Sequence, residues 1–340
     1  MDRDALEKTA HALVAPGKGI LAADESFGTI KKRFDSISVE STEETRRSYR
    51  EILFTTEAVE EFISGVILFD ETIRQSSAGG VPFSKVLPEK GIVPGIKVDA
   101  GAKDLAGFPG EKITEGLDGL RDRLSEYREF GARFAKWRAV ITIGGGAPTA
   151  TCIRANAHAL ARYAALCQEA GLVPIVEPEV LMDGDHTIER CEDVTFATLR
   201  SVYHELREHR VHLEGTLLKP NMVLSGRDCP KQAGVREIAA ATVRCFRRVV
   251  PAAVPGIVFL SGGQTAEQAT ERLSAMNAAA DHPWQLSFSY GRALQAPVLA
   301  AWRGERANVP AARDAFYHRS KLNGLARYGK YSREMEAGAA

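Results

Sequence analysis

The sequence predicts an α/β fold, a single parallel (β/α)8 TIM barrel with additional helices and a C-terminal tail. Three observations indicate this fold class. Short, β-rich apolar runs occur eight times, segments with helical spacing separate them, and the interval between runs is roughly 30–45 residues. Barrels of this kind often use 340 residues for one domain. We therefore expect one domain over residues 1–340, of which 327–340 form a flexible tail.

The predicted strands are short apolar runs bounded by turn residues. They are Gly19–Asp24, Gly65–Phe69, Val93–Val98, Phe134–Ile143, Leu172–Val180, Gly215–Val223, Gly256–Leu260 and Gln285–Tyr290. Helical spacing predicts helices over Gly116–Phe130, Ala155–Ala170, Val194–Glu208, Val235–Val249, Thr265–Met276 and Ala311–Ala326. Longer connections such as Glu25–Ser64 leave room for further helices.

The charge balance and the cysteines limit the class of partner and the compartment. Lys+Arg and Asp+Glu both count 44, so no global field attracts nucleic acid or an anionic membrane, and we expect neither as a partner. Phosphate affinity must therefore come from a local site. Five cysteines without a CxxC pair indicate reduced thiols, and the charged start lacks an apolar signal region. We expect a cytoplasmic protein.

One lysine, Lys219, interrupts the run Glu214–Met222, which otherwise has the pattern of a buried strand. Burial of an unpartnered ammonium is costly, and the pKa of a buried lysine commonly falls. A neutral lysine amine attacks carbonyl carbon and forms a Schiff base. The alternative is a lysine with a buried stem whose ammonium reaches water, which is common near strand ends.

Polar side chains gather at the carboxyl ends of the predicted strands, where barrel enzymes place their chemistry. Three pairs in which both members are charged, Lys97/Asp99, Lys136/Arg138 and Glu177/Glu179, have i, i+2 spacing, which projects both members of a pair from one face of a strand. The other polar residues of this group are Asp24, Lys219 and Asn221. A single pair is often only a structural ion pair. Together, on one end of a barrel, they favour a functional site.

These lysines and carboxylates suit aldol chemistry. A cation such as Lys136 near Lys219 would favour the neutral amine. The carboxylates of Glu177 and Asp24 would move protons as a Schiff base forms and hydrolyses. The resulting iminium would accept electrons from a neighbouring C–C bond. The pattern therefore predicts an aldol cleavage or condensation.

Glycine-rich segments end the last two strands and predict a phosphate site. Ser261-Gly262-Gly263 presents backbone N–H groups with little obstruction, and Gly291-Arg292 adds a guanidinium. Loops at this place in barrels bind phosphate recurrently. Residues 26–33 are a candidate second phosphate contact, for which a solvated basic turn is an equally good interpretation.

The eight histidines show no HxH or HExxH spacing and none ends a strand, so a zinc-polarised carbonyl mechanism is not supported. His204, His209 and His212 are expected on a helix surface and at its exit.

Along nearly its whole length the chain resembles class I fructose-bisphosphate aldolase, the Schiff-base type. The matching segments, in family order, are Gly19–Ser26, Gly65–Phe69, Gly95–Asp99, Phe134–Arg138, Val173–Glu179, Glu214–Met222, Leu260–Gln264 and Phe288–Gln295. The resemblance implies reversible cleavage of fructose 1,6-bisphosphate to dihydroxyacetone phosphate and glyceraldehyde 3-phosphate, in glycolysis and gluconeogenesis. It implies no metal or organic cofactor, and a homo-oligomer, commonly a tetramer.

Matched position by position, the resemblance implies Lys219 as the Schiff-base lysine and Glu177 as the main acid and base. Lys136 and Asp24 would assist proton transfer and C3–C4 cleavage, with Glu179 in support. The residues implied at the C1 phosphate are Ser261, Gly262, Gly263, Ser289, Gly291 and Arg292. Those implied at the end that takes the C6 phosphate are Ser26, Thr29, Arg33, Lys97 and Arg138.

Two positions depart from the family. Thr29 stands where serine is frequent, and many members end in a tyrosine that helps to protonate the enamine, whereas this sequence ends in Ala339-Ala340 and its last tyrosine is Tyr331. Either another group protonates the enamine or that step is slow. Two alternatives stay open: a Schiff-base aldolase that prefers another ketose phosphate, such as fructose 1-phosphate, and a catalytically silent binding or scaffold protein.

Overall fold

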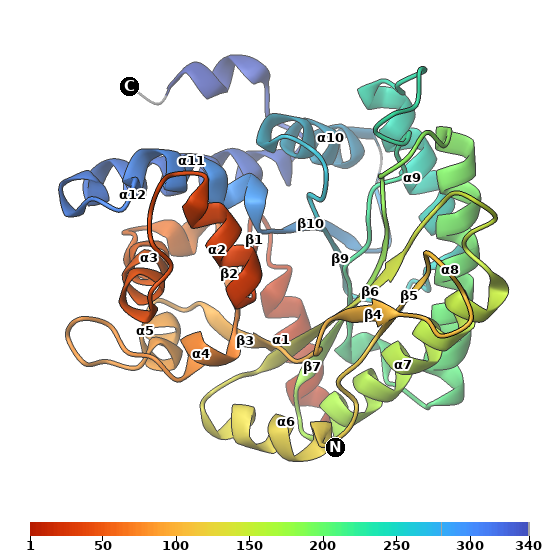
Figure 1. Cartoon of the computed structure of the whole chain (residues 1–340), viewed down its shortest axis with the longest axis horizontal. Helices are drawn as coiled ribbons and strands as arrows, with labels where there is room; N and C mark the ends of the chain where they lie inside the picture. Colours follow the sequence, from red (N-terminus) through yellow and green to blue (C-terminus); the bar gives the residue numbers. More distant parts are fainter. Residues whose placement is uncertain (280, 339–340) are drawn as a thin grey trace.

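The computed structural model of the chain describes residues 1–279 and 281–338. Eight parallel strands close into a barrel in the order β1-β2-β3-β6-β7-β8-β9-β10, and β10 pairs with β1. Helices surround the strands (Figure 1). The predicted (β/α)8 barrel is confirmed.

The barrel strands are β1 (Gly19–Ala23), β2 (Ile63–Leu68), β3 (Val93–Lys97), β6 (Phe134–Ile141), β7 (Val173–Val180), β8 (Leu217–Leu218), β9 (Gly256–Phe259) and β10 (Gln285–Tyr290). The α-helices are α1 (Arg3–Leu13), α2 (Phe27–Asp35), α3 (Glu43–Thr55), α4 (Asp70–Ile73), α5 (Phe83–Glu89), α6 (Leu120–Glu129), α7 (Ala150–Glu169), α8 (Ile188–Glu208), α9 (Val235–Val249), α10 (Ala266–Ala279), α11 (Arg292–Trp302) and α12 (Val309–Ala326). Short 3-10 turns are η1 (Val59–Glu61), η2 (Leu213–Gly215), η3 (Arg306–Asn308) and η4 (Arg333–Gly338).

A small antiparallel hairpin follows β3 and was not predicted. It pairs β4 (Ala102–Asp104) with β5 (Lys112–Thr114). All three residues of β4 are exposed. A strand of this length without a buried face has no hydrophobic alternation, which is the signal that sequence patterns offer.

Strand β8 is shorter than the predicted range Gly215–Val223 because Pro220 has no N–H to donate to the sheet. The N–H of Lys219 still donates to Val176 O at 2.8 Å. Beyond the proline, a side chain replaces the backbone pairing, since Asn221 Oδ1 accepts a hydrogen bond from Val180 N at 3.0 Å. Lys219 therefore lies at the end of regular pairing between β7 and β8, and Asn221 supports the backbone.

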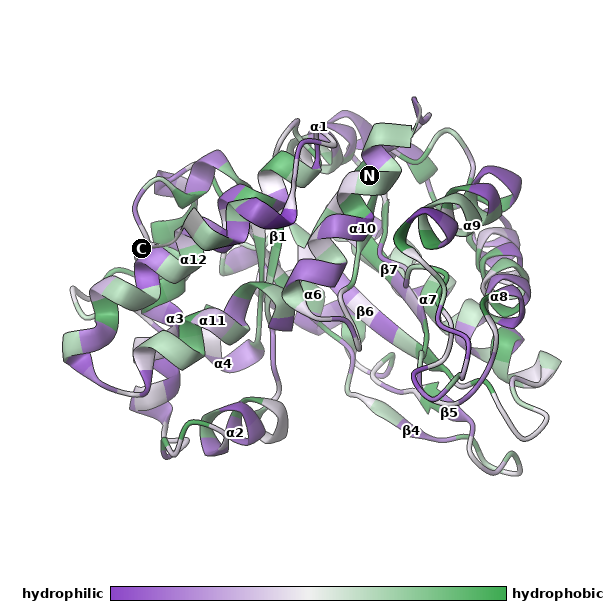
Figure 2. Cartoon of the chain, turned by 90° about the horizontal axis from the view of Figure 1, so that it is seen from above, coloured by the Kyte–Doolittle hydropathy of each residue, from purple (hydrophilic) through white to green (hydrophobic). Residues whose placement is uncertain are grey.

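Two apolar layers hold the barrel together. One lies between the strands and the outer helices, and α8 and α9 show the alternating hydrophobic and hydrophilic bands of amphipathic helices (Figure 2). The other fills the lower half of the lumen, which is the half at the amino-terminal ends of the strands. It contains Leu6, Ala10, Leu13, Val14, Ile20, Ala22, Ile67, Phe134, Val173, Ile175, Leu217 and Val258. Because the first four of these come from α1 and the turn after it, α1 closes the amino-terminal end of the barrel.

Glycine makes room for this inner layer. A Cβ added at Gly95 would lie 2.3 Å from the Phe134 ring, and one at Gly65 would lie 2.5 Å from Leu13 Cδ2. Real Cβ atoms do not approach this closely. The lower lumen is thus packed by large side chains against bare strand backbone.

The lumen changes from apolar to charged along the barrel axis. Ile175 of β7 is followed two residues later by Glu177, and Leu217 of β8 by Lys219. Side chains at i and i+2 project to the same side of a strand. The charged residues therefore lie above the apolar layer, at the carboxyl-terminal end of the barrel, which we call the mouth.

The described part of the expected tail packs on the outside of the barrel. Arg327 is buried and donates to Ala15 O at 3.0 Å, and Tyr331 OH donates to Glu336 Oε1 at 2.7 Å. Mobility of 327–340 stays a prediction, and residues 339–340 lie outside the described residues. None of the described helices has the length and apolar character needed to cross a membrane.

Candidate active site

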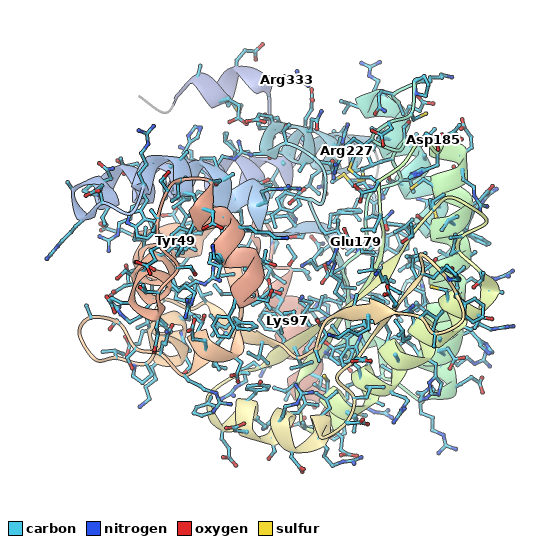
Figure 3. All side chains as sticks on the ribbon, in the orientation of Figure 1. Tyr49, Lys97, Glu179, Asp185, Arg227 and Arg333 are labelled. Atoms are coloured by element: carbon cyan, nitrogen blue, oxygen red, sulfur yellow. The ribbon has the colours of Figure 1, made fainter. Side chains whose placement is uncertain are left out.

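A cavity of about 730 Å³ opens at the mouth of the barrel. Every residue of the predicted site except Gly263 lines it. Side chains from β3 and β7, such as Lys97 and Glu179, lie near the centre of the molecule, whereas Arg333 lies at the periphery (Figure 3). The strands thus bring together groups that are up to 268 positions apart in the sequence, from Asp24 to Arg292.

Gly263 is the one predicted site residue that the structure does not place on the cavity wall. Its φ is +74°, and an added Cβ would lie 1.9 Å from Met182 Sδ. A left-handed conformation against a neighbouring side chain requires glycine. The geometry therefore gives Gly263 a packing role and does not support the expectation of a phosphate contact.

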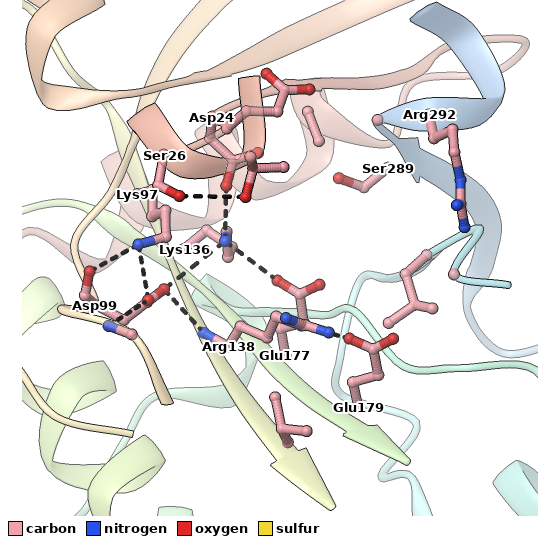
Figure 4. Close-up of a pocket in the computed structure, with 18 of the residues that line it drawn as sticks. Asp24, Ser26, Lys97, Asp99, Lys136, Arg138, Glu177, Glu179, Ser289 and Arg292 are labelled. Atoms are coloured by element: carbon pink, nitrogen blue, oxygen red, sulfur yellow. Dashed lines mark hydrogen bonds and ion pairs between the residues drawn. The ribbon is translucent and has the colours of Figure 1, made fainter. Parts of the chain in front are cut away.

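Lys136 is the centre of the charge network (Figure 4). Its Nζ lies 2.7 Å from Asp24 Oδ2, 3.5 Å from Glu177 Oε2 and 3.8 Å from Asp99 Oδ2. Burial alone would lower the pKa of Lys136, but the three carboxylates outweigh burial and raise this pKa above its ordinary value. Lys136 is therefore a fixed positive charge at neutral pH.

The carboxyl group of Asp24 is held in its ionised form. Burial would raise the pKa of Asp24, but the ammonium groups of Lys136 and Lys219 outweigh it and hold that pKa well below its ordinary value. Asp24 directly follows β1 and lines the cavity. It therefore offers a carboxylate that can accept hydrogen bonds and protons from a bound molecule.

Lys219 points to a carboxylate inside the mouth. Its Nζ lies 3.3 Å from Glu177 Oε1, and its side chain is only 5% exposed. This burial contradicts the alternative of an ammonium that extends to open water. The second oxygen of the same carboxylate, Glu177 Oε2, accepts no hydrogen bond within the described part of the chain. Glu177 thus lies between the amines of Lys219 and Lys136, with one oxygen toward each.

Further cations lie on the rim of the mouth, each with a carboxylate partner. Lys97 Nζ lies 2.8 Å from Asp99 Oδ1, and Arg138 donates to Glu179 (Figure 4). Arg138 is 43% exposed at its side chain, which places its guanidinium at the open edge. The pKa of Arg138 stays above its ordinary value because the carboxylates, chiefly Glu179, outweigh the effect of burial. Arg138 therefore remains charged.

Among the polar residues of the cavity wall, Glu25 and Ser36 were not predicted, and Lys32 was included only through the candidate range 26–33. On α2, Thr29, Arg33 and Ser36 have i, i+4 and i+7 spacing, so the helical period contained a signal for Ser36. Glu25 carried no such signal. Its carboxylate accepts a hydrogen bond from Arg33 Nη1. The other oxygen, Glu25 Oε2, lies 2.6 Å from Nη1 of the buried Arg50. Glu25 therefore positions Arg33.

Two helix amino-termini face the cavity. The N-cap residues of α2 and α11, Ser26 and Gly291, make no side-chain cap, and both line the cavity. Between them lies Ser289, whose Oγ is buried without a hydrogen-bond partner among the described residues. Free backbone N–H groups and an unpaired hydroxyl form a receptor for an anion.

The cavity wall has a local excess of positive charge in a neutral protein. Seven lysine and arginine side chains and five carboxylates line it, which leaves two positive charges in excess. The mouth of this barrel holds buried lysine amines at its centre and anion receptors around them. These features define the class of lysine-dependent enzymes that act on phosphorylated carbonyl compounds.

The comparisons with known proteins specify the family. The model of the family "Fructose-bisphosphate aldolase class-I" matches residues 5–340, and the chain belongs to this family. It is therefore a metal-independent lyase of the Schiff-base type.

Relatives match over almost their whole length. The chain is 60% identical over 332 residues to a "Probable fructose-bisphosphate aldolase class 1" of Xanthomonas campestris, covering 97% of this chain and 99% of that protein. It is 54% identical to the human "Fructose-bisphosphate aldolase C", covering 98% and 93%. A solved structure of the Plasmodium falciparum aldolase, in complex with TRAP and a small-molecule inhibitor, superposes with a TM-score of 0.96 at 52% identity and covers 97% of this chain and 95% of that one.

Proposed function

We propose that this chain cleaves fructose 1,6-bisphosphate reversibly to dihydroxyacetone phosphate and glyceraldehyde 3-phosphate, with Lys219 as the Schiff-base residue. The observation that carries the proposal is the buried Lys219 amine, 3.3 Å from Glu177 Oε1, in a mouth lined by anion receptors. Family membership supports the same reaction.

Schiff-base formation requires the Lys219 amine to lose a proton and the substrate oxygen to gain protons. Glu177 is the carboxylate closest to Lys219, so we assign it the first transfer. The amine then attacks C2 of the ketose, and the carbonyl oxygen leaves as water after it takes up two protons. Lys136 Nζ, 3.5 Å from Glu177 Oε2, holds the other side of this carboxylate and so positions it beside Lys219.

Cleavage then follows from the iminium. The electron pair of the C3–C4 bond moves into the C2–C3 enamine, and the C4 hydroxyl loses its proton as the aldehyde forms. We assign the proton acceptor to the ionised Asp24, assisted by Lys136 at 2.7 Å, with Glu179 in support. The enamine takes up a proton at C3, and water releases the ketone product and restores the amine. Tyr331 does not line the cavity, and its hydroxyl donates to Glu336, so it is not placed for this protonation.

The cavity wall offers two groups of anion donors for the two phosphates, and the groups adjoin where Arg33 Nη2 lies 3.6 Å from the position of a Cβ at Gly291. We assign the C1 phosphate to the end formed by Ser261, Gly262, Ser289, Gly291 and Arg292. We assign the C6 phosphate to the end formed by Ser26, Thr29, Arg33, Lys97 and Arg138. Each set combines hydroxyl or backbone donors with a guanidinium, which is the usual composition of phosphate sites.

Borohydride trapping tests the assignment of Lys219. The chain is incubated with dihydroxyacetone phosphate, reduced and digested, and we expect one adduct, on the peptide that contains Lys219. Lys219→Met should abolish it, whereas Lys103→Met, a change at an exposed lysine of β4, should not. An adduct on another lysine, or none on the natural chain, would overturn the proposal. The second outcome would favour the silent scaffold protein.

Substitutions on the rim test whether the chain prefers fructose 1,6-bisphosphate to the rival substrate, fructose 1-phosphate. We expect a higher kcat/KM for the bisphosphate, and we expect Arg138→Ala to lower this value for the bisphosphate more than for the monophosphate. Arg303→Ala is the matched control, because Arg303 follows α11 and does not line the cavity. Comparable turnover of both sugars by the natural chain would remove the claim that the rim selects a bisphosphate.

We also propose a homotetramer in the cytoplasm. The resemblance to a commonly tetrameric family supports the tetramer, and the five buried, unpaired thiols support the cytoplasmic location. Light scattering after size exclusion measures the assembly. A mass of one chain, 37.0 kDa, would refute the tetramer.

A further inference from the structure

Three potential metal ligands meet on the outside of the barrel. They are His158 of α7 and Glu205 and His209 of α8, and one ligand atom of each lies within 4.8 Å of those of the other two. Helices α7 and α8 pack against each other over the outer face of the sheet (Figure 1). None of the three residues lines the cavity. No spacing in the sequence reveals this group, because its third member comes from another helix.

Of the two residues of α8, His209 is already oriented by its own helix. Glu205 and His209 have i, i+4 spacing and so lie on one side of the helix. Nδ1 of His209 lies 2.9 Å from the backbone oxygen of Glu205. An imidazole that donates from Nδ1 to a carbonyl presents the lone pair of Nε2 to a metal ion. Glu205 Oε2 lies 3.6 Å from Nδ1 of the same ring, so the Glu205 side chain must rotate toward Nε2 when a metal ion binds.

His158 faces this pair from the neighbouring helix. Its ring centroid is 5.0 Å from that of His209, with the ring planes at 75°. Ligand atoms around a tetrahedral Zn²⁺ lie about 3.3 Å apart, as bond lengths of about 2.0–2.1 Å require. His158 is exposed, so rotation of its side chain can close the remaining gap without a movement of the helices.

We propose that His158, Glu205 and His209 bind one Zn²⁺ ion and thereby bridge α7 and α8. Two imidazoles and one carboxylate are a ligand set typical of zinc, with water at the fourth position. The harder ions Mg²⁺ and Ca²⁺ select oxygen ligands instead. The five thiols of the chain are all buried, so they do not compete for the ion in the folded protein. The bridge joins the helices that follow β6 and β7, the strands that carry Lys136 and Glu177.

Titration of the full chain with zinc tests the proposal. The protein carries no histidine tag and is first treated with EDTA, and Zn²⁺ binding is followed by calorimetry. We expect one ion per chain and, with zinc in large excess over Kd, a Tm that rises by several degrees. Co²⁺ in place of Zn²⁺ should give the visible absorption of a tetrahedral site without a sulfur-to-cobalt band.

Substitutions identify the ligands. His158→Ala and His209→Ala should each weaken binding by at least about tenfold, since loss of even an outer partner of a metal ligand costs 10–100-fold. The matched control is His204→Ala, because His204 lies on the same helix next to Glu205 but outside the group. It should leave the affinity unchanged.

The proposal is overturned if the natural chain does not bind zinc, or if the ligand variants bind it as tightly as the His204→Ala control. Its failure is separable from failure of the proposed function. EDTA should remove the gain in Tm and leave aldol cleavage unchanged, because the metal site lies outside the cavity and the family is metal-independent.

Discussion

Lys136→Met tests the charge network of the mouth most directly. The substitution keeps the length of a side chain that is only 4% exposed and removes its charge. Asp24 loses a partner at 2.7 Å, and Glu177 loses one at 3.5 Å. Removal of one partner of a buried ion pair costs about 3–5 kcal/mol, because the remaining charge stays buried without compensation. We expect the free energy of unfolding at pH 7 to fall by about this amount.

The pH dependence of stability should also differ between the natural chain and the variant. In the natural chain the pKa of Asp24 is lowered, so its contribution to stability is complete above the ordinary value of about 3.9 and is lost only as the pH falls through the folded-state pKa. In Lys136→Met the effect of burial is left with less opposition and the pKa of Asp24 rises. A carboxyl group whose pKa is higher in the folded state than in the unfolded state destabilises the protein as the pH increases. The difference in stability between the natural chain and the variant should therefore shrink as the pH falls from 8 to 5.

Urea unfolding at pH 5, 7 and 8, followed by tryptophan fluorescence, measures both effects. Lys103→Met is the matched control, since Lys103 is exposed and forms no ion pair with any described residue. The cleavage rate should also fall, by about 10²–10⁴-fold, which is the usual contribution of acid–base groups. Equal unfolding free energies of the two variants at pH 7 would refute the reasoning.

Two further substitutions test the anion receptor and the packing of the lumen. Ser289→Ala removes a buried, unpaired hydroxyl, whose burial costs about 1–3 kcal/mol, so thermal unfolding should show unchanged or higher stability while KM for the bisphosphate rises. Lower stability with an unchanged KM would contradict the assignment. Gly95→Ala places a Cβ 2.3 Å from the Phe134 ring and should cost about 1–3 kcal/mol in urea unfolding. Gly28→Ala, whose Cβ meets nothing within 4 Å, is the control, and equal midpoints would show that the lumen is not tightly packed.

The elements of the barrel could be predicted because their signals are local. Residues 285–290 and 235–249 form a strand and a helix with the predicted bounds, since apolar periodicity reports which face of an element is buried. The end of β8 was not predicted, although Pro220 is visible in the sequence. Pairing depends on the N–H groups that face the neighbouring strand, and only the barrel shows which these are.

The candidate site was partly determined by the same periodicity. The i, i+2 spacing placed Lys136 and Glu177 on lumen faces, and the rule that chemistry lies at strand ends placed them at the mouth. The spacing did not determine which charges are in contact. Glu177, rather than Glu179, is the neighbour of Lys219 because the height of each side chain along the axis depends on the stagger between strands.

By itself, the sequence determined the fold class, the strand ends that carry charge and the residues of the mouth. Only the tertiary structure decided that Gly263 packs on Met182, that Glu25 positions Arg33, and which carboxylates surround Lys136. It also brought His158 to Glu205 and His209. The physical reason is the same in each case. Contacts between segments that are distant in the sequence depend on register and helix packing, and neither leaves a periodic signal in one chain.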